Sequence, residues 1–153
     1  MSTDNRAGLL AAIQEASRIS VSRTVSFQQA VAARLGIGSS DLNCLNLLQL
    51  AGPMTAGKLA EEIGLTKGGA ITAALDRLER AGMIERERDP ADRRRIIIRP
   101  TQRVIDLVGP LMPADVWENL YDRYTDDELR VVLDFTERSS ATVQTLIDRV
   151  SST

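Results

Sequence analysis

The chain has 153 residues, 43% of them hydrophobic and 26% charged, which is the composition of one globular domain with a sizeable core. It has no histidine and one cysteine, which excludes histidine-based acid/base catalysis, histidine-ligated metal sites, an internal disulfide and a cysteine cluster for zinc. The net charge is −2, but the segment from Gly52 to Arg103 holds eleven basic and eight acidic residues, so one region suits a polyanion.

No apolar run approaches the ~18 residues of a membrane-spanning helix, and the polar start from Met1 to Arg6 carries no export signal. We therefore expect a cytoplasmic protein that does not bind membranes. Because histidine and cysteine clusters are missing, we also expect no enzymatic activity, no metal site and no cofactor.

The N-terminal part predicts one long helix, Ala7 to Leu35, ended by the glycine-containing segment 36–38. Its apolar residues lie on several sides, which indicates contact with more than one partner. Ser39 or Ser40 is expected to cap a second helix over about 41–50.

Two further helices joined by a tight turn follow. Thr55 is expected to cap the first, which reaches Ile63, and Thr66 to cap the second, Lys67 to Ala81. Gly82 stands where a left-handed glycine ends a helix. The spacing of apolar residues in the second helix predicts one buried face, made of Ala70, Ile71, Ala74, Leu75 and Leu78.

A hairpin rich in arginine comes next, with strands predicted at Met83 to Arg88 and Arg95 to Arg99. Asp89-Pro90 suits the first two positions of a type I turn. The returning strand is led by three consecutive arginines, and their mutual repulsion favours a polyanionic partner such as nucleic acid: Arg93, Arg94 and Arg95.

The alternative for this hairpin is a purely structural turn in which Asp89 and Asp92 pair with nearby arginines. Two aspartates do not balance three arginines. We therefore expect Asp89 and Asp92 to brace the loop, while the remaining positive charge is available to a phosphate or a narrow minor groove.

The C-terminal part predicts a kinked or broken helix up to Tyr124, because Pro110 and Pro113 interrupt it. Thr125 and Glu128 form a capping box that begins the last helix. Long helices at both ends of the sequence suit an intertwined dimer.

Helix, turn, helix and basic hairpin are the order of a winged helix-turn-helix, so the predicted fold class is mainly α with a small β-hairpin wing. We expect a dimerisation helix over 1–38, a DNA-binding lobe over 39–100 and dimerisation helices over 101–153. The second helix of the pair would enter the major groove, and its N-terminal N–H groups suit a phosphate. Its outward residues are the candidate DNA contacts, with a solvated surface as the alternative: Lys67, Gly68, Thr72, Ala73, Asp76 and Arg77.

The residues from Gly52 to Lys58 have the spacing of a phosphate-binding P-loop. A P-loop has serine or threonine after the lysine, whereas this chain has Leu59, and it follows a buried strand rather than a helix. Nucleotide binding is therefore disfavoured.

Two other features have an ordinary and a functional interpretation. Cys44 lies among leucines and suits a small apolar filler, with a redox-sensing thiol as the alternative. Trp117 and Tyr121 share one helix and suit core or dimer packing, with the wall of a small-ligand pocket as the alternative. The candidate pocket residues are Ser20, Thr24, Cys44, Trp117 and Tyr121.

The stretch from Leu42 to Thr101 resembles the MarR family of bacterial regulators. The family's wing signature appears as Asp92-Arg93-Arg94 followed by Pro100-Thr101, where Pro100 stands in place of the usual leucine. Ala73 stands where relatives often carry a larger polar or basic residue, so base contacts in the major groove should be sparse.

The resemblance implies a homodimer that binds a pseudo-palindromic operator, with half-sites about one helical turn apart. It implies that Arg94 is the wing arginine and Asp92 its loop partner, and that a small aromatic or phenolic effector loosens DNA binding. Thiol-sensing relatives keep a cysteine near the start of the first helix, which this chain lacks. We expect a DNA-binding transcriptional regulator, a repressor; the alternatives are a winged helix for protein–protein contact and redox sensing through Cys44.

Overall fold

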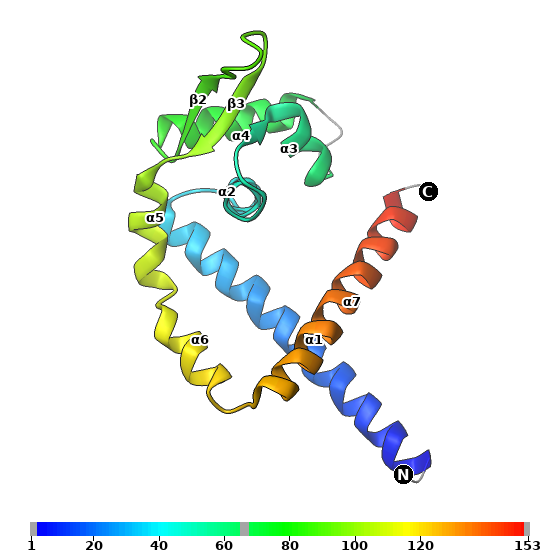
Figure 1. Ribbon diagram of the computed structural model, residues 1–153. Coiled ribbons are helices and arrows are strands. Elements are labelled where there is room, and N and C mark those ends of the chain that lie inside the picture. Colours follow the sequence, from blue (N-terminus) through cyan, green and yellow to red (C-terminus); the bar gives the residue numbers. More distant parts are fainter. Residues whose placement is uncertain (1–2, 65–67, 152–153) are drawn as a thin grey trace. The chain divides into compact units, whose positions relative to one another are not determined.

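The computed structural model describes residues 3–64 and 68–151 (Figure 1). It is mostly helical with one small antiparallel sheet, which confirms the predicted fold class. In chain order the elements are α1 (Thr3–Leu35), α2 (Ser39–Ala51), β1 (Met54–Thr55), α3 (Ala56–Glu62), α4 (Gly68–Arg80), β2 (Ile84–Arg88), β3 (Ile96–Pro100), α5 (Gln102–Val108), the 3-10 turn η1 (Gly109–Leu111), α6 (Ala114–Tyr121) and α7 (Asp126–Ser151).

The chain forms two compact units, Met1–Leu111 and Met112–Thr153. The first holds the predicted helix-turn-helix and wing, and the second holds α6 and α7. The functional regions predicted from the sequence, with boundaries at 38 and 100, stay a prediction.

The core of the first unit lies where α2, α3, α4 and α5 meet the sheet. Four residues of α4 at helical spacing are buried, so most of its predicted inward face is confirmed, but Ala70 is exposed. A single side of the helix therefore faces the core, and the residues on the other side near its start are exposed. The buried core residues are Cys44, Leu45, Leu48, Met54, Leu59, Ile71, Ala74, Leu75, Leu78, Met83, Ile84, Ile98 and Val104.

Gly82 ends α4 in the left-handed conformation, as predicted, with φ +67°. The N–H of Met83 donates to the carbonyl of Leu78 at 2.9 Å and the N–H of Gly82 to that of Glu79 at 2.9 Å. This pair of bonds is the Schellman motif, and a side chain at φ > 0 would strain it. It turns the chain directly from α4 into the wing.

The start of α2 differs from the prediction that Ser39 or Ser40 caps it. The N-cap is Gly38, whose N–H donates to Oδ2 of Asp41 at 3.3 Å. The acceptor thus comes from the third helical residue, and both serines lie inside the helix. The Thr55 cap of α3 is confirmed, since its hydroxyl oxygen accepts from the N–H of Lys58 at 3.3 Å.

The sheet has three strands in the order β1-β3-β2, all antiparallel. β1 has two residues and was absent from the sequence prediction. Ile98 of the central strand pairs with Met54 on one side and with Arg86 on the other. The hairpin of β2 and β3 is therefore joined through β1 to the chain between α2 and α3. Its loop projects away from the helices of this unit (Figure 1).

The predicted breaks in the C-terminal part are confirmed. α5 passes into η1 at Gly109, and Pro113 then precedes α6. The capping box is present as well: the N–H of Thr125 donates to Oε2 of Glu128 at 2.8 Å, and the N–H of Glu128 donates to the Thr125 hydroxyl oxygen at 3.4 Å. The predicted Thr66 cap and the start of α4 at Lys67 lie outside the described residues.

The helices α1, α6 and α7 expose many large apolar side chains, in contrast to the core. None of the described helices has the length and apolar character needed to cross a membrane. Most of the exposed apolar side chains of α7 follow helical spacing: Val132, Leu133, Val143, Leu146, Ile147 and Val150. Val131 and Phe135 of the same helix are exposed as well.

Candidate nucleic-acid interface

The second helix of the helix-turn-helix, α4, is amphipathic. Ile71, Leu75 and Leu78 fix it on the core, and the opposite side near its start is exposed and made of small residues. Gly68 is the first residue of the helix, and Thr72 and Ala73 are both exposed. With so little side chain there, a partner can approach the helix backbone closely. Lys67, the remaining predicted contact at this end, lies outside the described residues.

Arg77 lies on α4 but contacts α2. Its Nε donates to Oδ2 of Asp41 at 2.9 Å and its Nη2 to Oδ1 at 2.6 Å. The Asp41 side chain is 2% exposed and that of Arg77 is 47% exposed. The hydrogen bonds to Asp41 raise the pKa of Arg77 further above its ordinary value. Arg77 is thus held by a buried carboxylate while its side chain stays half-exposed, and its predicted contact with DNA stays a prediction.

Asp76 is also engaged within the protein. Its Oδ1 accepts from Nη2 of Arg86 at 2.6 Å, and Nη1 of Arg86 donates to Oε2 of Glu79 at 2.8 Å. Arg86 belongs to β2, so one guanidinium bridges the wing and two carboxylates of α4. Arg86 is not among the contact residues predicted from the sequence. The signal was its position two residues after buried Ile84, on the same side of the strand.

The wing loop is closed by a tight turn at Asp92–Arg95, where the N–H of Arg95 donates to the carbonyl of Asp92 at 2.9 Å. Arg93 and Arg94 are therefore the two corner residues. The sequence predicted the turn to begin at Asp89-Pro90, and the hydrogen-bonded turn lies three residues later. Asp89 instead accepts from the N–H of Ala91 at 2.9 Å through Oδ1, the local bond typical of an Asx turn.

The two aspartates of the loop contact its backbone. Oδ1 of Asp92 accepts from the N–H of Arg94 at 3.0 Å, so Asp92 contacts the main chain of Arg94 rather than its guanidinium. The carboxylate of Asp89 lies 3.9 Å from Nε of Arg95, a long ion pair. Within the described residues, no carboxylate forms an ion pair with Arg93 or Arg94. The loop thus presents two adjacent cations at its corner.

The base of the wing is closed by Thr101. Its hydroxyl donates to the carbonyl of Gly82 at 2.7 Å, and its N–H donates to the carbonyl of Met83 at 3.0 Å. The end of α4, the start of β2 and the start of α5 therefore meet at one residue. Pro100, next to it, pairs with Ile84 at the end of the hairpin, away from the loop.

Cys44 is fully buried in the core. Burial, and then the negative charge of Asp41, raise the pKa of its thiol from 9.0 to about 11. A thiol of this kind is protonated at neutral pH and out of contact with oxidants, which favours the apolar-filler interpretation over redox sensing. It is not among the residues that line the pocket described below, between α1 and α2.

The other candidate pocket residues fall in different parts of the chain. Ser20 and Thr24 are one turn apart on α1, where the Thr24 hydroxyl donates to the Ser20 carbonyl at 2.9 Å. Trp117 and Tyr121 belong to α6 in the second unit, where their rings stack with centroids 6.1 Å apart. The proposed site combining the two groups stays a prediction.

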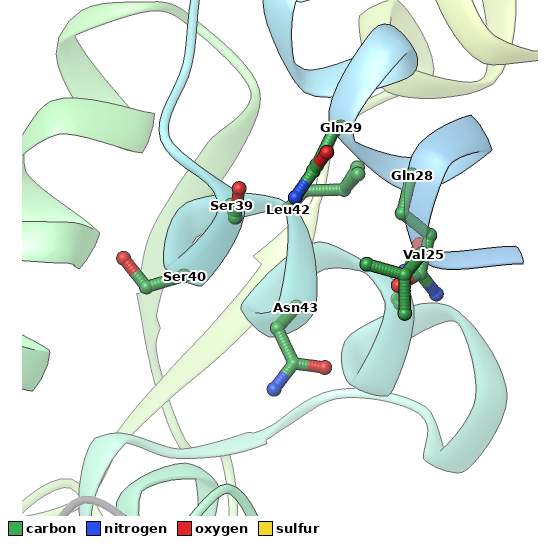
Figure 2. Close-up of a pocket in the computed structure, with 8 residues that line it drawn as sticks. Val25, Gln28, Gln29, Ser39, Ser40, Leu42 and Asn43 are labelled. Atoms are coloured by element: carbon green, nitrogen blue, oxygen red, sulfur yellow. The ribbon is translucent and has the colours of Figure 1, made fainter. Parts of the chain in front are cut away.

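A pocket of about 400 Å³ does lie in the first unit, between the C-terminal half of α1 and the start of α2 (Figure 2). It begins one residue beyond Thr24. Its lining is mostly uncharged and polar, with four carboxamides and two hydroxyl groups: Val25, Gln28, Gln29, Ser39, Ser40, Leu42, Asn43 and Asn46.

The segment with P-loop spacing has a different structure. α2 rather than a strand precedes Gly52, and Lys58 lies within α3 with its N–H bonded to Thr55. Across residues 3–64 and 68–151, no cluster of three or more cysteine, aspartate or glutamate residues is arranged to hold a metal ion.

Comparison with known proteins agrees with this geometry. The sequence pattern of the MarR family matches residues 38–96. The chain is 39% identical to the uncharacterized HTH-type transcriptional regulator YcgE of Bacillus subtilis (strain 168). The alignment spans 132 residues and covers 84% of each of the two chains. These names indicate a regulator rather than an enzyme.

Solved structures share the fold. A MarR family protein from Bacillus stearothermophilus is 23% identical with a TM-score of 0.62, over 90% of this chain and 96% of that one. A mutant MarR from E. coli, crystallised in complex with operator DNA, is 21% identical with a TM-score of 0.51, over 86% and 97%. The pattern of the family, the identity to YcgE and the winged-helix fold together show that this chain belongs to the MarR family of DNA-binding transcriptional regulators.

Proposed function

We propose that this regulator is a homodimeric repressor that binds a pseudo-palindromic operator, acting on DNA in the cytoplasm. α4 would enter the major groove and the wing loop the adjacent minor groove. The observation that carries the proposal is the corner of the wing loop. There Arg93 and Arg94 stand side by side, with no ion pair to the described residues and with their backbone fixed by Asp92.

The major-groove part of the proposal rests on α4. Its exposed N-terminal side offers backbone N–H groups and small side chains, which suit close approach to a phosphate and to base edges. Thr72 and Ala73 can contact the methyl group of thymine, while Asp76 lies one turn further along. Arg77, half-exposed although bonded to Asp41, keeps its Nη1 for a phosphate.

The minor-groove part rests on the wing. Arginine inserts well into a narrow minor groove because the potential there is strongly negative. Arg94 is the leading candidate, Arg93 the second, and Arg95 the least available because Asp89 lies beside it. The contacts within the loop place Arg95 last. The resemblance to the MarR family places Arg94 before Arg93.

The dimer rests on the apolar surfaces of the terminal helices. The exposed large apolar side chains of α1 range from 37% exposed at Ile13 to 63% exposed at Val21. The large apolar side chains of α7 are also exposed. Leaving so much apolar area in water is unfavourable, and a second copy would cover it. The charges are complementary too. α1 has four arginines and two acidic residues, whereas residues 112–153 have four arginines and nine acidic residues.

An effector that releases the DNA is the last part of the proposal. The pocket between α1 and α2 has the volume of a small-molecule site, and its amides and hydroxyls suit the polar group of a phenolic compound. Addition of 4-hydroxybenzoate as a probe should raise the melting temperature and weaken DNA binding. Asn43→Leu, which removes a polar lining group, should reduce both effects.

Selection of duplexes from a random-sequence library tests the proposal as a whole. We expect enrichment of an inverted repeat whose half-sites are about one helical turn apart. Footprinting should then show protection of two major grooves and the flanking minor grooves, and a reporter carrying the site upstream should be repressed. If no sequence is enriched, the rival function, a winged helix that binds an acidic protein surface, gains support.

A further inference from the structure

We infer that Arg86 masks the carboxylates of Asp76 and Glu79: its positive charge, paired with both, offsets their negative charge. We also infer that operator affinity depends on this mask. The inference rests on the proposed function, because it concerns the side of α4 proposed to face DNA. It assigns Arg86 a positioning role: it acts through the two carboxylates and does not itself contact the DNA.

The geometry is a three-residue cluster. Nη2 of Arg86 lies 2.6 Å from Oδ1 of Asp76, and Nη1 lies 2.8 Å from Oε2 of Glu79. The two carboxylates are three residues apart on α4, so they share one side of the helix. Both terminal nitrogens of Arg86 are therefore engaged, each by a different carboxylate.

The strand places Arg86 for this contact. Side chains alternate along β2, so Arg86 lies on the same side as buried Ile84, which packs in the core with α4. Glu85 and Glu87 lie on the opposite side. Arg86 is thus the first position beyond the core from which a side chain of the wing can reach the outer part of α4.

Folding stability does not account for this arrangement. The Arg86 side chain is 30% exposed, Asp76 47% and Glu79 42%, so all three remain in contact with water. Ion pairs of this exposure contribute little to folding and are screened by salt. The contact matters more where a dense array of phosphates approaches.

The effect on DNA binding follows from the charges. With Arg86 in place, one cation offsets two carboxylates on the helix; without it, both are left unbalanced beside the phosphates. Each would lie within the ~10 Å over which charges interact at moderate ionic strength. Arg86 therefore removes a repulsion that the sequence of α4 would otherwise create.

Variants of this cluster can be compared on one duplex, the sequence enriched by the wild-type protein. Arg86→Gln should weaken binding by about tenfold. The triple variant Arg86→Gln/Asp76→Asn/Glu79→Gln should recover most of the affinity, because the carboxylates that needed the mask are gone. Arg99→Gln is the matched control: it removes an arginine paired with Glu87 on the other side of the hairpin and should cause a smaller loss.

Three results would overturn the inference. Wild-type affinity of Arg86→Gln would show that no mask is needed. A triple variant as weak as Arg86→Gln would show that Arg86 contacts the DNA itself. An equal loss in Arg99→Gln would show an effect of net charge alone. If the wild-type protein enriches no duplex, the proposed function fails instead, and circular dichroism of each variant separates misfolding from these outcomes.

Discussion

Arg77 and Asp41 form a two-point contact between α4 and α2, with Nε to Oδ2 at 2.9 Å and Nη2 to Oδ1 at 2.6 Å. They are 36 residues apart in sequence. Asp41 also accepts from the N–H of Gly38, so one buried carboxylate both caps α2 and fixes α4. The orientation of α4 is therefore tied to the start of α2.

Replacing Asp41 by alanine should destabilise the fold by about 2–3 kcal/mol, since it removes a helix cap and charged hydrogen bonds. Urea unfolding measures this as a lower midpoint at an unchanged slope. Asp41→Asn keeps a side-chain oxygen for the cap and should lose less. Equal stability of Asp41→Ala and wild type would contradict the role given to the pair.

Arg94→Ala should weaken operator binding about ten- to a hundredfold if this side chain enters the minor groove. Gel shifts on the selected duplex measure the change in affinity. Arg95→Ala should lose less affinity, because Arg95 lies beside Asp89. The wing assignment would be lost if Arg94→Ala bound as tightly as wild type. For a phosphate contact at Arg93, Arg93→Ala should flatten the slope of log K against log salt by about 0.9.

The Cys44 thiol should not react with a maleimide in the folded protein at neutral pH, because it is buried and its pKa is raised to about 11. As the pH rises, the unfolded chain loses this proton near its ordinary value of 9.0, before the folded chain does. Stability should therefore fall between about pH 9 and 11. The Cys44→Ala variant should not show this fall in stability at alkaline pH. Peroxide should not change the DNA binding of the wild-type protein. Rapid labelling without denaturant would argue for the redox alternative.

The capping box of α7 should make stability depend on acid pH. The backbone N–H of Thr125, and then its hydroxyl, hold the pKa of Glu128 below its ordinary value. The stabilisation is present above the ordinary pKa and disappears as the pH falls through the lowered one. Glu128→Gln should thus melt earlier than wild type at neutral pH, with a difference that shrinks in acid. Glu137→Gln makes the same change of charge further along α7 and is the matched control.

Leu146→Glu should dissociate the proposed dimer, because a carboxylate would replace a half-exposed apolar side chain at the expected interface. Sedimentation velocity measures the shift towards monomer. Ala141→Glu, an exposed position on another side of the same helix, is the control and should leave the assembly unchanged. A wild-type protein that is already monomeric at micromolar concentration would contradict the dimer.

The sequence predicted the parts of this fold that depend on nearby residues. The Thr55 cap, the Gly82 terminus and the Thr125–Glu128 box each involve residues within a few positions of one another, and all three are present. The tight turn of the wing was placed three residues early, because the local bond of Asp89 closes an Asx turn and leaves the chain to turn again at Arg93 and Arg94.

Contacts between distant residues could not be read in this way. The two-residue strand β1 exists because β3 offers it hydrogen bonds, and its own sequence carries no strand pattern. Arg77 and Asp76 were both predicted to point outward, as helix periodicity requires. Their carboxylate and guanidinium partners come from α2 and β2, and periodicity says nothing about partners.

Thr101 connects the wing to the start of α5 by two hydrogen bonds. Because its hydroxyl and its N–H hold the carbonyls of Gly82 and Met83, the first turn of α5 cannot rotate without moving the end of α4 and the foot of the hairpin together. A small displacement at this foot is enlarged along the length of the hairpin before it reaches Arg93 and Arg94. The wing and the end of α4 are thus both linked to the start of a single short helix, α5.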